Sequence, residues 1–213
     1  MNIHREQLLL YAVTDRHLLA GRSLVLMVEE AILAGVTLIQ YRDKELSFEE
    51  RISEAILLHE VTKRYGVPLI MNDDLEAALM VKAEGVHLGQ EDAAIEDARR
   101  KLGNDIIIGA TAHNVEEALA AQASGADYIG AGALFGSATK NNTVPMSLAT
   151  LTAICEAVTI PVVAIGGINE DNILTLEGSG ICGVAVVSAI FGSKNITEST
   201  RTLNRMAKQI SCQ

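Results

Sequence analysis

Short apolar runs rich in β-branched residues recur along this chain at roughly 25-residue intervals. Continuous runs of this kind are typical of strands in a parallel sheet, because such a sheet is buried on both faces. We therefore predict eight β-strands, over residues 8–13, 37–41, 68–71, 85–88, 106–110, 128–130, 161–165 and 183–187.

The segments between these runs carry apolar residues at three- and four-residue spacing, which predicts amphipathic helices. The predicted helices span residues 24–34, 48–65, 75–83, 93–102, 115–124, 148–158, 172–178 and 197–210. Thr197, followed by Thr200, predicts a capped start for the last helix. Glycines at the helix-to-strand joints are expected to be left-handed residues that end helices, at Gly35, Gly66, Gly85, Gly103 and Gly125.

Strict alternation of eight strands with helices predicts an α/β protein that is a single (β/α)8 TIM barrel. An open, doubly wound sheet is the alternative that the pattern leaves open. The 213 residues contain no linker, low-complexity tract or break in composition, so we expect one catalytic domain over residues 1–213.

Composition narrows the choice of partners. Aromatic residues make up 3% of the chain and tryptophan is absent, which argues against base stacking on nucleic acid. A formal net charge of -10 repels nucleic acid and anionic membranes alike. The polar start of the chain and three cysteines without metal-ligand spacing favour a cytoplasmic protein in a reducing compartment. We expect small-molecule substrates, and the possibility of a homo-oligomer stays open.

Polar residues follow many of the predicted strands, and a β/α barrel builds its active site at that end of the strands. Gln40, Arg42 and Lys44 follow the second strand and share one face if the segment is extended. A planar guanidinium, an ammonium and an amide suit a diphosphate. The alternative is a solvated loop whose charge is balanced by Asp43 and Glu45.

Carboxylates follow the third and fourth strands. Asp73 lies after the third strand and Asp92 after the fourth, so a barrel places them on neighbouring strands. Hard oxygen ligands of this kind favour Mg²⁺. Helix capping is the competing interpretation, and we expect Asp74 to cap the following helix while Asp73 binds metal. Asp92 is a candidate cap for the helix after it.

The last two strand ends are typical of a phosphate site. Gly166-Gly167 allows close backbone approach, and Ser188 is predicted to start a helix whose N-terminus favours an anion. Tight-turn packing is the alternative. His87 and His113 are interpreted as packed structural residues rather than bases. Neither a dinucleotide fingerprint nor a phosphate-binding P-loop occurs in the chain.

The order and spacing of these motifs resemble the bacterial, single-domain thiamine phosphate synthase family. The pieces that carry the resemblance are Gln40-Tyr41-Arg42-Asp43-Lys44, Asn72-Asp73, the segment 85–92, the segment 125–130 and the segment 164–168. The resemblance implies a transferase that joins 4-amino-2-methyl-5-pyrimidinylmethyl diphosphate to a thiazole phosphate, carboxylated or not. It implies thiamine monophosphate and diphosphate as products, Mg²⁺ as cofactor, and a dissociative mechanism through a pyrimidinylmethyl cation.

The resemblance also implies roles for particular residues. Asp73 and Asp92 would hold Mg²⁺. Catalysis would fall to Arg42, Lys44, Lys140 and Thr111, where Thr111 replaces the serine usual in the family. The substrate-binding residues would be Gln40, Arg42, Lys44, Asn72, Thr111, Ser137, Thr139, Lys140, Gly167, Val187 and Ser188.

The sequence departs from the family in the loop after the sixth strand. The family commonly has Pro-Thr where this chain has Gly136-Ser137, so we expect a looser flap. Three other functions stay open from the sequence. They are a thiazole tautomerase paralogue, a Schiff-base aldolase that uses Lys44 or Lys140, and a non-catalytic binder of thiamine intermediates.

Overall fold

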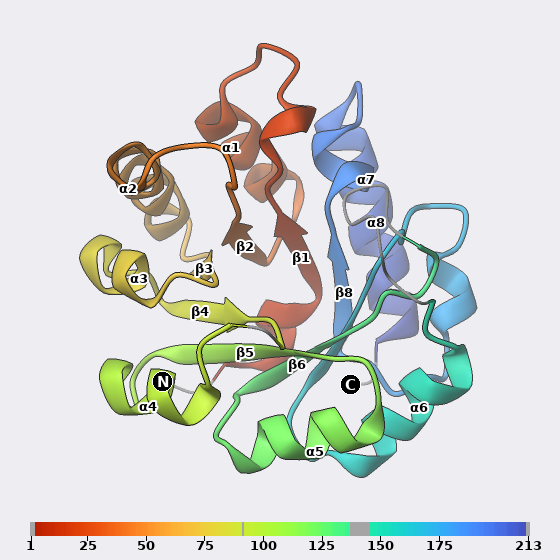
Figure 1. Ribbon diagram of the computed structural model, residues 1–213. Helices are drawn as coiled ribbons and strands as arrows, with labels where there is room; N and C mark the ends of the chain where they lie inside the picture. The colour runs from red at the N-terminus through yellow and green to blue at the C-terminus, as the bar shows by residue number, and fades with distance from the viewer. Residues whose placement is uncertain (1–2, 91, 137–144, 212–213) are drawn as a thin grey trace.

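Eight parallel strands form a closed barrel surrounded by helices in the computed structural model, which describes residues 3–90, 92–136 and 145–211 (Figure 1). Each strand pairs with the next in the chain, and β8 pairs with β1 through the register Leu10↔Val184. The strands are β1 (Leu10–Val13), β2 (Leu38–Tyr41), β3 (Leu69–Asn72), β4 (Gly85–Leu88), β5 (Ile107–Ala112), β6 (Tyr128–Ala131), β7 (Val162–Ile165) and β8 (Gly183–Val186). The predicted (β/α)8 barrel is confirmed, and the closing pair rules out the open sheet.

The helices follow the predicted order and pack around the outside of the barrel (Figure 1). They are α1 (Leu24–Ala34), α2 (Phe48–Arg64), α3 (Leu75–Val81), α4 (Ile95–Leu102), α5 (Val115–Ala123), α6 (Leu148–Ala157), α7 (Ser188–Phe191) and α8 (Ile196–Ile210). Short 3-10 helices add η1 (Arg5–Leu8), η2 (Arg16–Leu18) and η3 (Ile173–Leu176). Within the described part of the chain, no helix has the length and apolar character needed to span a bilayer.

Two predicted local features were wrong, and the capped start of the last helix is shifted by one residue from the predicted one. The first strand starts at Leu10, because the preceding residues form η1. The helix predicted over residues 172–178 is only the single turn η3, followed by Gly178 at φ 78°. The last helix starts at Ile196, and Asn195 caps it by accepting a hydrogen bond from the backbone N–H of Glu198.

Gly85 is not the helix-ending residue that the sequence predicted. The other four joint glycines have positive φ, but Gly85 lies in β4 and Lys82 takes the left-handed position after α3. A Cβ at Gly85 would lie 2.5 Å from the carbonyl oxygen of Ile107. This glycine is therefore needed for close strand packing.

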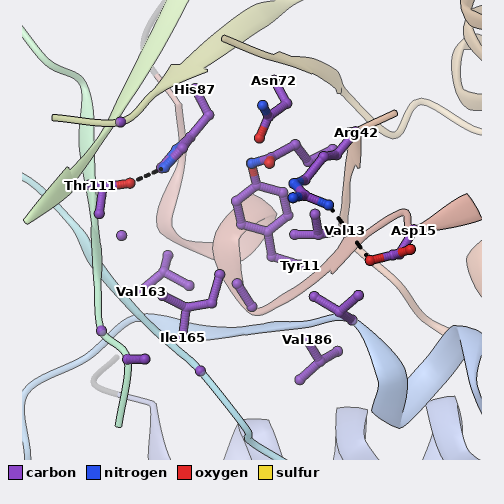
Figure 2. Close-up of a pocket in the computed structure, with 18 of the residues that line it drawn as sticks. Tyr11, Val13, Asp15, Arg42, Asn72, His87, Thr111, Val163, Ile165 and Val186 are labelled. Atoms are coloured by element: carbon purple, nitrogen blue, oxygen red, sulfur yellow. Dashed lines mark hydrogen bonds and ion pairs between the residues drawn. The ribbon is translucent and has the colours of Figure 1, made fainter. Parts of the chain in front are cut away.

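The alternation of side chains along each strand divides the core into two parts. In β1, Leu10 and Ala12 face the helices, while Tyr11 and Val13 belong to a separate cluster in the barrel interior (Figure 2). The interior cluster consists of Ile3, Leu8, Tyr11, Val13, Leu38, Ile70, Ile107, Tyr128, Val163 and Ala185. The interior of the barrel is thus filled by side chains below the mouth.

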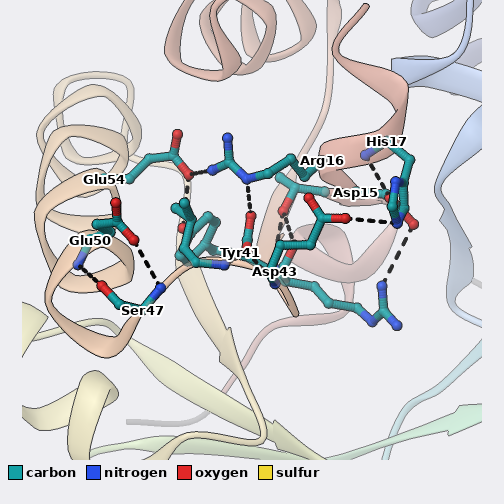
Figure 3. Close-up of polar contacts among 12 residues, drawn as sticks. Asp15, Arg16, His17, Tyr41, Asp43, Ser47, Glu50 and Glu54 are labelled. Carbon is teal, nitrogen blue, oxygen red and sulfur yellow. Dashed lines mark hydrogen bonds and ion pairs between the residues drawn. The ribbon is translucent and has the colours of Figure 1, made fainter.

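A partly buried ionic network anchors the loop that follows β2 (Figure 3). The Arg16 guanidinium donates to both Asp43 and Glu54, and the Tyr41 hydroxyl donates to Glu54 Oε2 at 2.8 Å. Asp43 Oδ1 also accepts the backbone N–H groups of Glu45 and Leu46, at 2.9 and 2.8 Å. Burial by itself would raise the pKa of Asp43, but these two N–H groups and Arg16 hold it below its usual value.

A second arginine joins loops at the opposite end of the barrel, where the strands begin. Arg99 donates to the carbonyl oxygens of Gly103, Ile106 and Gly125, at 3.0, 2.6 and 2.9 Å. Its other contact is Asp127 Oδ2 at 2.6 Å. The end of α4 is thereby tied to the start of β5 and to the loop before β6, far from the mouth.

We predict that Arg99→Ala lowers the free energy of unfolding by about 2–4 kcal/mol, because it leaves a half-buried carboxylate and several carbonyls without their charged donor. Its neighbour Arg100 is exposed and contacts only Asp97 within α4 among the described contacts. Arg100→Ala should therefore cost less than about 0.5 kcal/mol. Urea unfolding followed by circular dichroism measures the stability of both variants. Equal losses of unfolding free energy would show that the contacts of Arg99 do not stabilise this end of the barrel.

Asp43→Asn should lower the free energy of unfolding at neutral pH by about 1–3 kcal/mol, because an amide cannot balance Arg16. The folded pKa of Asp43 is depressed, so its stabilising contribution is complete above the unfolded value of about 3.9 and is lost as pH falls through the folded value. The difference between wild type and variant should therefore be constant above about pH 5 and shrink below about pH 4.

Urea midpoints measured as a function of pH test this dependence. Glu45→Gln is the matched control, because the Glu45 side chain is about half exposed and lies 3.3 Å from the exposed His17. It should change stability by less than about 0.5 kcal/mol at every pH. A stability difference for Asp43→Asn that stays unchanged at about pH 3 would show that charge is not its origin.

Candidate active site

One pocket opens at the mouth of the barrel, where all the strands end, and residues from every strand or the loop after it line it (Figure 2). The sequence-predicted residues that line it are Gln40, Arg42, Lys44, Asn72, Asp73, Asp92, Thr111, Gly167, Val187 and Ser188. The predicted residues Ser137, Thr139 and Lys140 lie outside the described part of the chain. The roles of all these residues stay predictions, but barrel closure brings the described ones together.

Two basic side chains on the loop after β2 reach the pocket. Arg42 is fixed through its backbone, which exchanges hydrogen bonds with the Thr14 hydroxyl at 2.8 and 3.0 Å. Its guanidinium lies 3.6 Å from Asp15 Oδ2 (Figure 2). Lys44 Nζ donates to Asp73 Oδ2 at 2.8 Å. Arg42 and Lys44 are therefore ion-paired with carboxylates that follow the neighbouring strands β1 and β3.

This arrangement contradicts the interpretation of the β2 loop as a solvated segment that balances its own charge. The Asp43 side chain forms an ion pair with Arg16 outside the pocket and is only 1% exposed. Glu45 lies beside His17. Neither acid pairs with Lys44 among the described contacts, so Arg42 and Lys44 direct their positive charge to the pocket.

The predicted acid pair, Asp73 and Asp92, meets in the pocket, where the two side chains are hydrogen-bonded to each other. Asp73 has φ 63°, an uncommon backbone conformation for a non-glycine residue. Burial raises the pKa of Asp92, and its hydrogen bond with Asp73 raises it further. Burial opposes ionisation of Asp73 as well, but Lys44 and Asp92 lower its pKa. A proton held by the pair therefore belongs mainly to Asp92.

Of the two acids predicted as helix caps, Asp74 and Asp92, only Asp74 caps a helix. Asp74 caps α3 by accepting the backbone N–H of Ala77 at 2.9 Å, as predicted. Asp92 does not cap α4, because its Oδ2 accepts the backbone N–H of Gly89 at 2.6 Å and the helix starts after Ala94 without a side-chain cap. Asp92 is thus held at the mouth by its own loop.

The donor set fits a magnesium ion that is shared with a substrate. Among the described residues, no three His, Cys, Asp or Glu side chains form a metal-binding group. Mg²⁺ rarely needs such a cage, because it keeps several waters and binds through one or two carboxylates plus substrate phosphates. A coupled pair of carboxylates beside two cations offers hard oxygens in that number.

The turns after β7 and β8 form the side of the pocket predicted to bind phosphate. Gly166 and Gly167 both have positive φ, at 105° and 66°. A Cβ at Gly167 would lie 2.3 Å from the Gly136 carbonyl oxygen, so the turn has no room for a side chain. Val187 precedes the short helix α7, which begins at Ser188 as predicted.

A chain of hydrogen bonds crosses the floor of the pocket. The Gln40 amide donates to the Tyr11 hydroxyl, which lies 2.9 Å from the Tyr128 hydroxyl. The Tyr128 hydroxyl is 3.0 Å from His87 Nδ1, and His87 Nε2 is 3.0 Å from Thr111 Oγ1 (Figure 2). The structural interpretation of His87 is therefore incomplete, because the ring lines the pocket.

Sequence reasoning did not single out Tyr11, Tyr128 or Asp15 as site residues. Tyr11 and Tyr128 occupy inward positions in β1 and β6, and Asp15 follows β1 as the other polar residues follow their strands. Polar groups at inward positions of predicted strands were the available signal.

His113 lies at the rim, half-exposed and paired with Glu117 of α5 at 2.9 Å. Partial burial would raise the pKa of Glu117, but the His113 backbone N–H and ring lower it. His113 is therefore not packed in the core as predicted, although its pairing with Glu117 holds it at the rim.

Comparison with known proteins places this barrel in a family. The family model described as thiamine monophosphate synthase matches residues 10–190. Thiamine-phosphate synthase from Clostridium novyi is 47% identical over 195 residues, which cover 91% of this chain and 96% of that protein. The enzyme from Chloroflexus aurantiacus is 46% identical over 198 residues, covering 92% and 91%.

A solved structure agrees with these sequence relatives. Thiamine phosphate pyrophosphorylase from Pyrococcus furiosus superposes with a TM-score of 0.89 at 38% identity, over 97% of this chain and 98% of that one. A crystal structure of 3-hexulose-6-phosphate synthase, at 15% identity and a TM-score of 0.65, shares the fold alone. The family match and the identity over nearly the whole length establish that the chain belongs to the thiamine monophosphate synthase family.

Proposed function

We propose that this protein is a transferase that joins an aminopyrimidinylmethyl diphosphate to a thiazole phosphate, giving thiamine monophosphate and diphosphate. The observation that carries the proposal is the cluster of Arg42, Lys44, Asp73 and Asp92 in one mouth of the barrel. Two cations beside two carboxylates suit a diphosphate that arrives with a divalent metal. Family membership supplies the substrate class.

In the proposed mechanism, the bond between the pyrimidine methylene carbon and the diphosphate oxygen breaks first. The electron pair leaves with the diphosphate, and the cation that remains is stabilised by the amino group of the ring. The thiazole nitrogen then forms the new C–N bond with its lone pair. That nitrogen carries no proton, so no general base is required and neither His87 nor His113 needs to act as one.

Negative charge develops on the departing diphosphate, and the basic side chains are placed to stabilise it. Arg42 offers a planar fork and Lys44 a point charge, both already oriented by Asp15 and Asp73. Gln40 and Asn72, together with Thr111, would hold the pyrimidine part of the substrate. Lys140 would add a third cation from the loop after β6.

Asp73 and Asp92 would hold Mg²⁺ through their carboxylate oxygens. The ion supplies Lewis-acid stabilisation of the diphosphate oxygens when it is bound. In the structure Lys44 donates to Asp73, and the backbone N–H of Gly89 donates to Asp92. At the other side of the mouth, Gly167 and the Val187-Ser188 turn would receive the thiazole phosphate, with Ser137 and Thr139 closing over it.

The other functions considered from the sequence fit this site less well. A thiazole tautomerase needs no diphosphate clamp. A Schiff-base aldolase needs a neutral, desolvated lysine, whereas the Lys44 side chain is 58% exposed and ion-paired with Asp73. A non-catalytic binder would not need a coupled acid pair beside its cations.

The purified protein, given the pyrimidine diphosphate, the thiazole phosphate and Mg²⁺, should form thiamine monophosphate, measured by fluorescence after oxidation. EDTA should abolish the product. Asp73→Asn and Asp92→Asn should each lower kcat/KM by about 10²–10³, because each removes a carboxylate that would hold the Mg²⁺ needed to stabilise the departing diphosphate.

Asp74→Asn is the matched control for these substitutions. Asp74 is next to Asp73 in the chain, but it caps α3 and pairs with Arg51. Asparagine caps a helix about as well as aspartate, so this variant should keep kcat/KM within about threefold of wild type. Folded wild-type protein that forms no thiamine monophosphate would refute the synthase proposal, and isomerisation of the thiazole phosphate would then identify a tautomerase.

A further inference from the structure

The proposed mechanism gives no role to Tyr11, Tyr128 or His87, although all three lie in the pocket lining or directly beneath it. The tyrosine rings are buried, with 2% and 0% exposure. Their centroids are 6.0 Å apart in an edge-to-face arrangement. A buried polar chain that fills the barrel interior is costly unless every member is hydrogen-bonded, so the direction of each bond can be worked out.

Both phenols in the chain are neutral. Burial raises the pKa of Tyr11 and that of Tyr128 far above the ordinary value for tyrosine. Each hydroxyl therefore has one proton to donate and can accept as well. Among the described residues, the Thr200 hydroxyl is the only buried side-chain oxygen or nitrogen without a partner, so both tyrosines are satisfied.

The Gln40 amide sets the direction. Its Nε2 donates to the Tyr11 oxygen, which leaves the Tyr11 proton to be donated to Tyr128. The Tyr128 proton then goes to His87 Nδ1. If Tyr128 donated to Tyr11 instead, the Tyr11 proton would point against the amide and stay buried without an acceptor, which costs about 1–3 kcal/mol.

The same reasoning continues to the pocket surface. A His87 Nδ1 that accepts a proton from Tyr128 belongs to the neutral tautomer with its own proton on Nε2. That Nε2–H donates to Thr111 Oγ1 at 3.0 Å. Because the hydroxyl oxygen is used as an acceptor from His87, the Thr111 proton is left to donate to a ligand in the pocket.

The barrel makes room for this arrangement with glycines on the neighbouring strands. A Cβ at Gly109 would lie 2.1 Å from Tyr128 Cζ, inside its ring. A Cβ at Gly130 would lie 3.0 Å from His87 Cε1. The Tyr128 and His87 rings are 5.5 Å apart. The two rings are therefore positioned by the backbone around them and not only by their hydrogen bonds.

We propose that Tyr128 and His87 are positioning residues that fix the Thr111 hydroxyl as a hydrogen-bond donor to a ring nitrogen of the bound aminopyrimidine. This inference rests on the proposed function for the identity of the ligand. The one described hydrogen bond of the Thr111 side chain is to His87, and Arg42 and Lys44 lie on another strand end. Because the proposed diphosphate clamp follows β2 and Thr111 lies on β5, its hydroxyl is assigned to the pyrimidine end of the substrate, where the ring nitrogens are acceptors.

Nuclear magnetic resonance of the free protein tests the tautomer without any substrate. Protein labelled with ¹⁵N in its five histidines is studied at about pH 8, above the ordinary histidine pKa, and His87 is assigned with His87→Gln. The wild type should show an unprotonated Nδ1 and a protonated Nε2. Tyr128→Phe should change the Nδ1 signal of His87. Tyr41→Phe removes another tyrosine hydroxyl, which is not part of this hydrogen-bond chain, and should leave the Nδ1 signal of His87 unchanged.

A proton on Nδ1 of His87, or on both ring nitrogens, in the wild type would overturn the proposal. His87 would then donate to the Tyr128 hydroxyl, and the hydrogen bonds between Gln40 and His87 would point the opposite way. This outcome corresponds to a Gln40 amide that presents its oxygen to Tyr11. The experiment does not depend on turnover, so it separates failure of this inference from failure of the proposed reaction.

Calorimetric binding of the pyrimidine diphosphate and of two analogues, each with one ring nitrogen replaced by C–H, tests the ligand. Wild type should lose about tenfold in affinity with one analogue, the equivalent of one neutral hydrogen bond. Thr111→Val and Tyr128→Phe should bind the parent more weakly and lose less than about threefold on the same replacement. Equal losses in wild type and both variants would refute the ring-nitrogen contact. A folded wild type that does not bind the parent would instead refute the proposed function.

Discussion

The structure depends on the closure of eight parallel strands into one ring, with β8 hydrogen-bonded to β1. Closure fixes which side chains point inward, and it places every strand end at one rim. Residues as distant in the chain as Asp15 and Ser188 therefore line one pocket. The chemistry of this protein is a consequence of that geometry, because no single segment carries a complete set of groups.

The net charge of the chain constrains how the rim can bind phosphate. A protein with a formal charge of -10 must bind phosphorylated substrates through a local excess of positive charge or through a metal. For the first, Arg16 pairs with Asp43 and leaves Arg42 and Lys44 lining the pocket, but Asp15, Asp73 and Asp92 line it too, so the described side chains give no net positive charge there. The proposed mechanism therefore relies on the second, a metal that Asp73 and Asp92 would hold. Lys44 donates to Asp73 and the backbone N–H of Gly89 donates to Asp92, and these contacts hold the two adjacent carboxylates at the mouth.

The two ends of the barrel differ in what their polar contacts do. At the start of the strands, Arg99 satisfies backbone carbonyls and Asp127, and these contacts serve stability. At the mouth, Asp15 and Asp73 pair with Arg42 and Lys44, the cations that are proposed to bind the diphosphate. The buried tyrosines between the two ends connect the packed interior to Thr111, so the same side chains fill the core and orient the site.

The sequence by itself determined the barrel, the order of its elements and the strand ends that carry the site. Continuous apolar runs and helical spacing are local patterns, and closure follows once eight such units alternate. Tertiary structure alone decided which partner each polar group takes. Asp74 and Asp92 both read as caps, but only Asp74 caps a helix. Gly85 reads as a helix end but is required by its contact with Ile107 across the sheet. His87 reads as a packed residue because its partners lie 24 and 41 positions away, a separation that no local pattern contains.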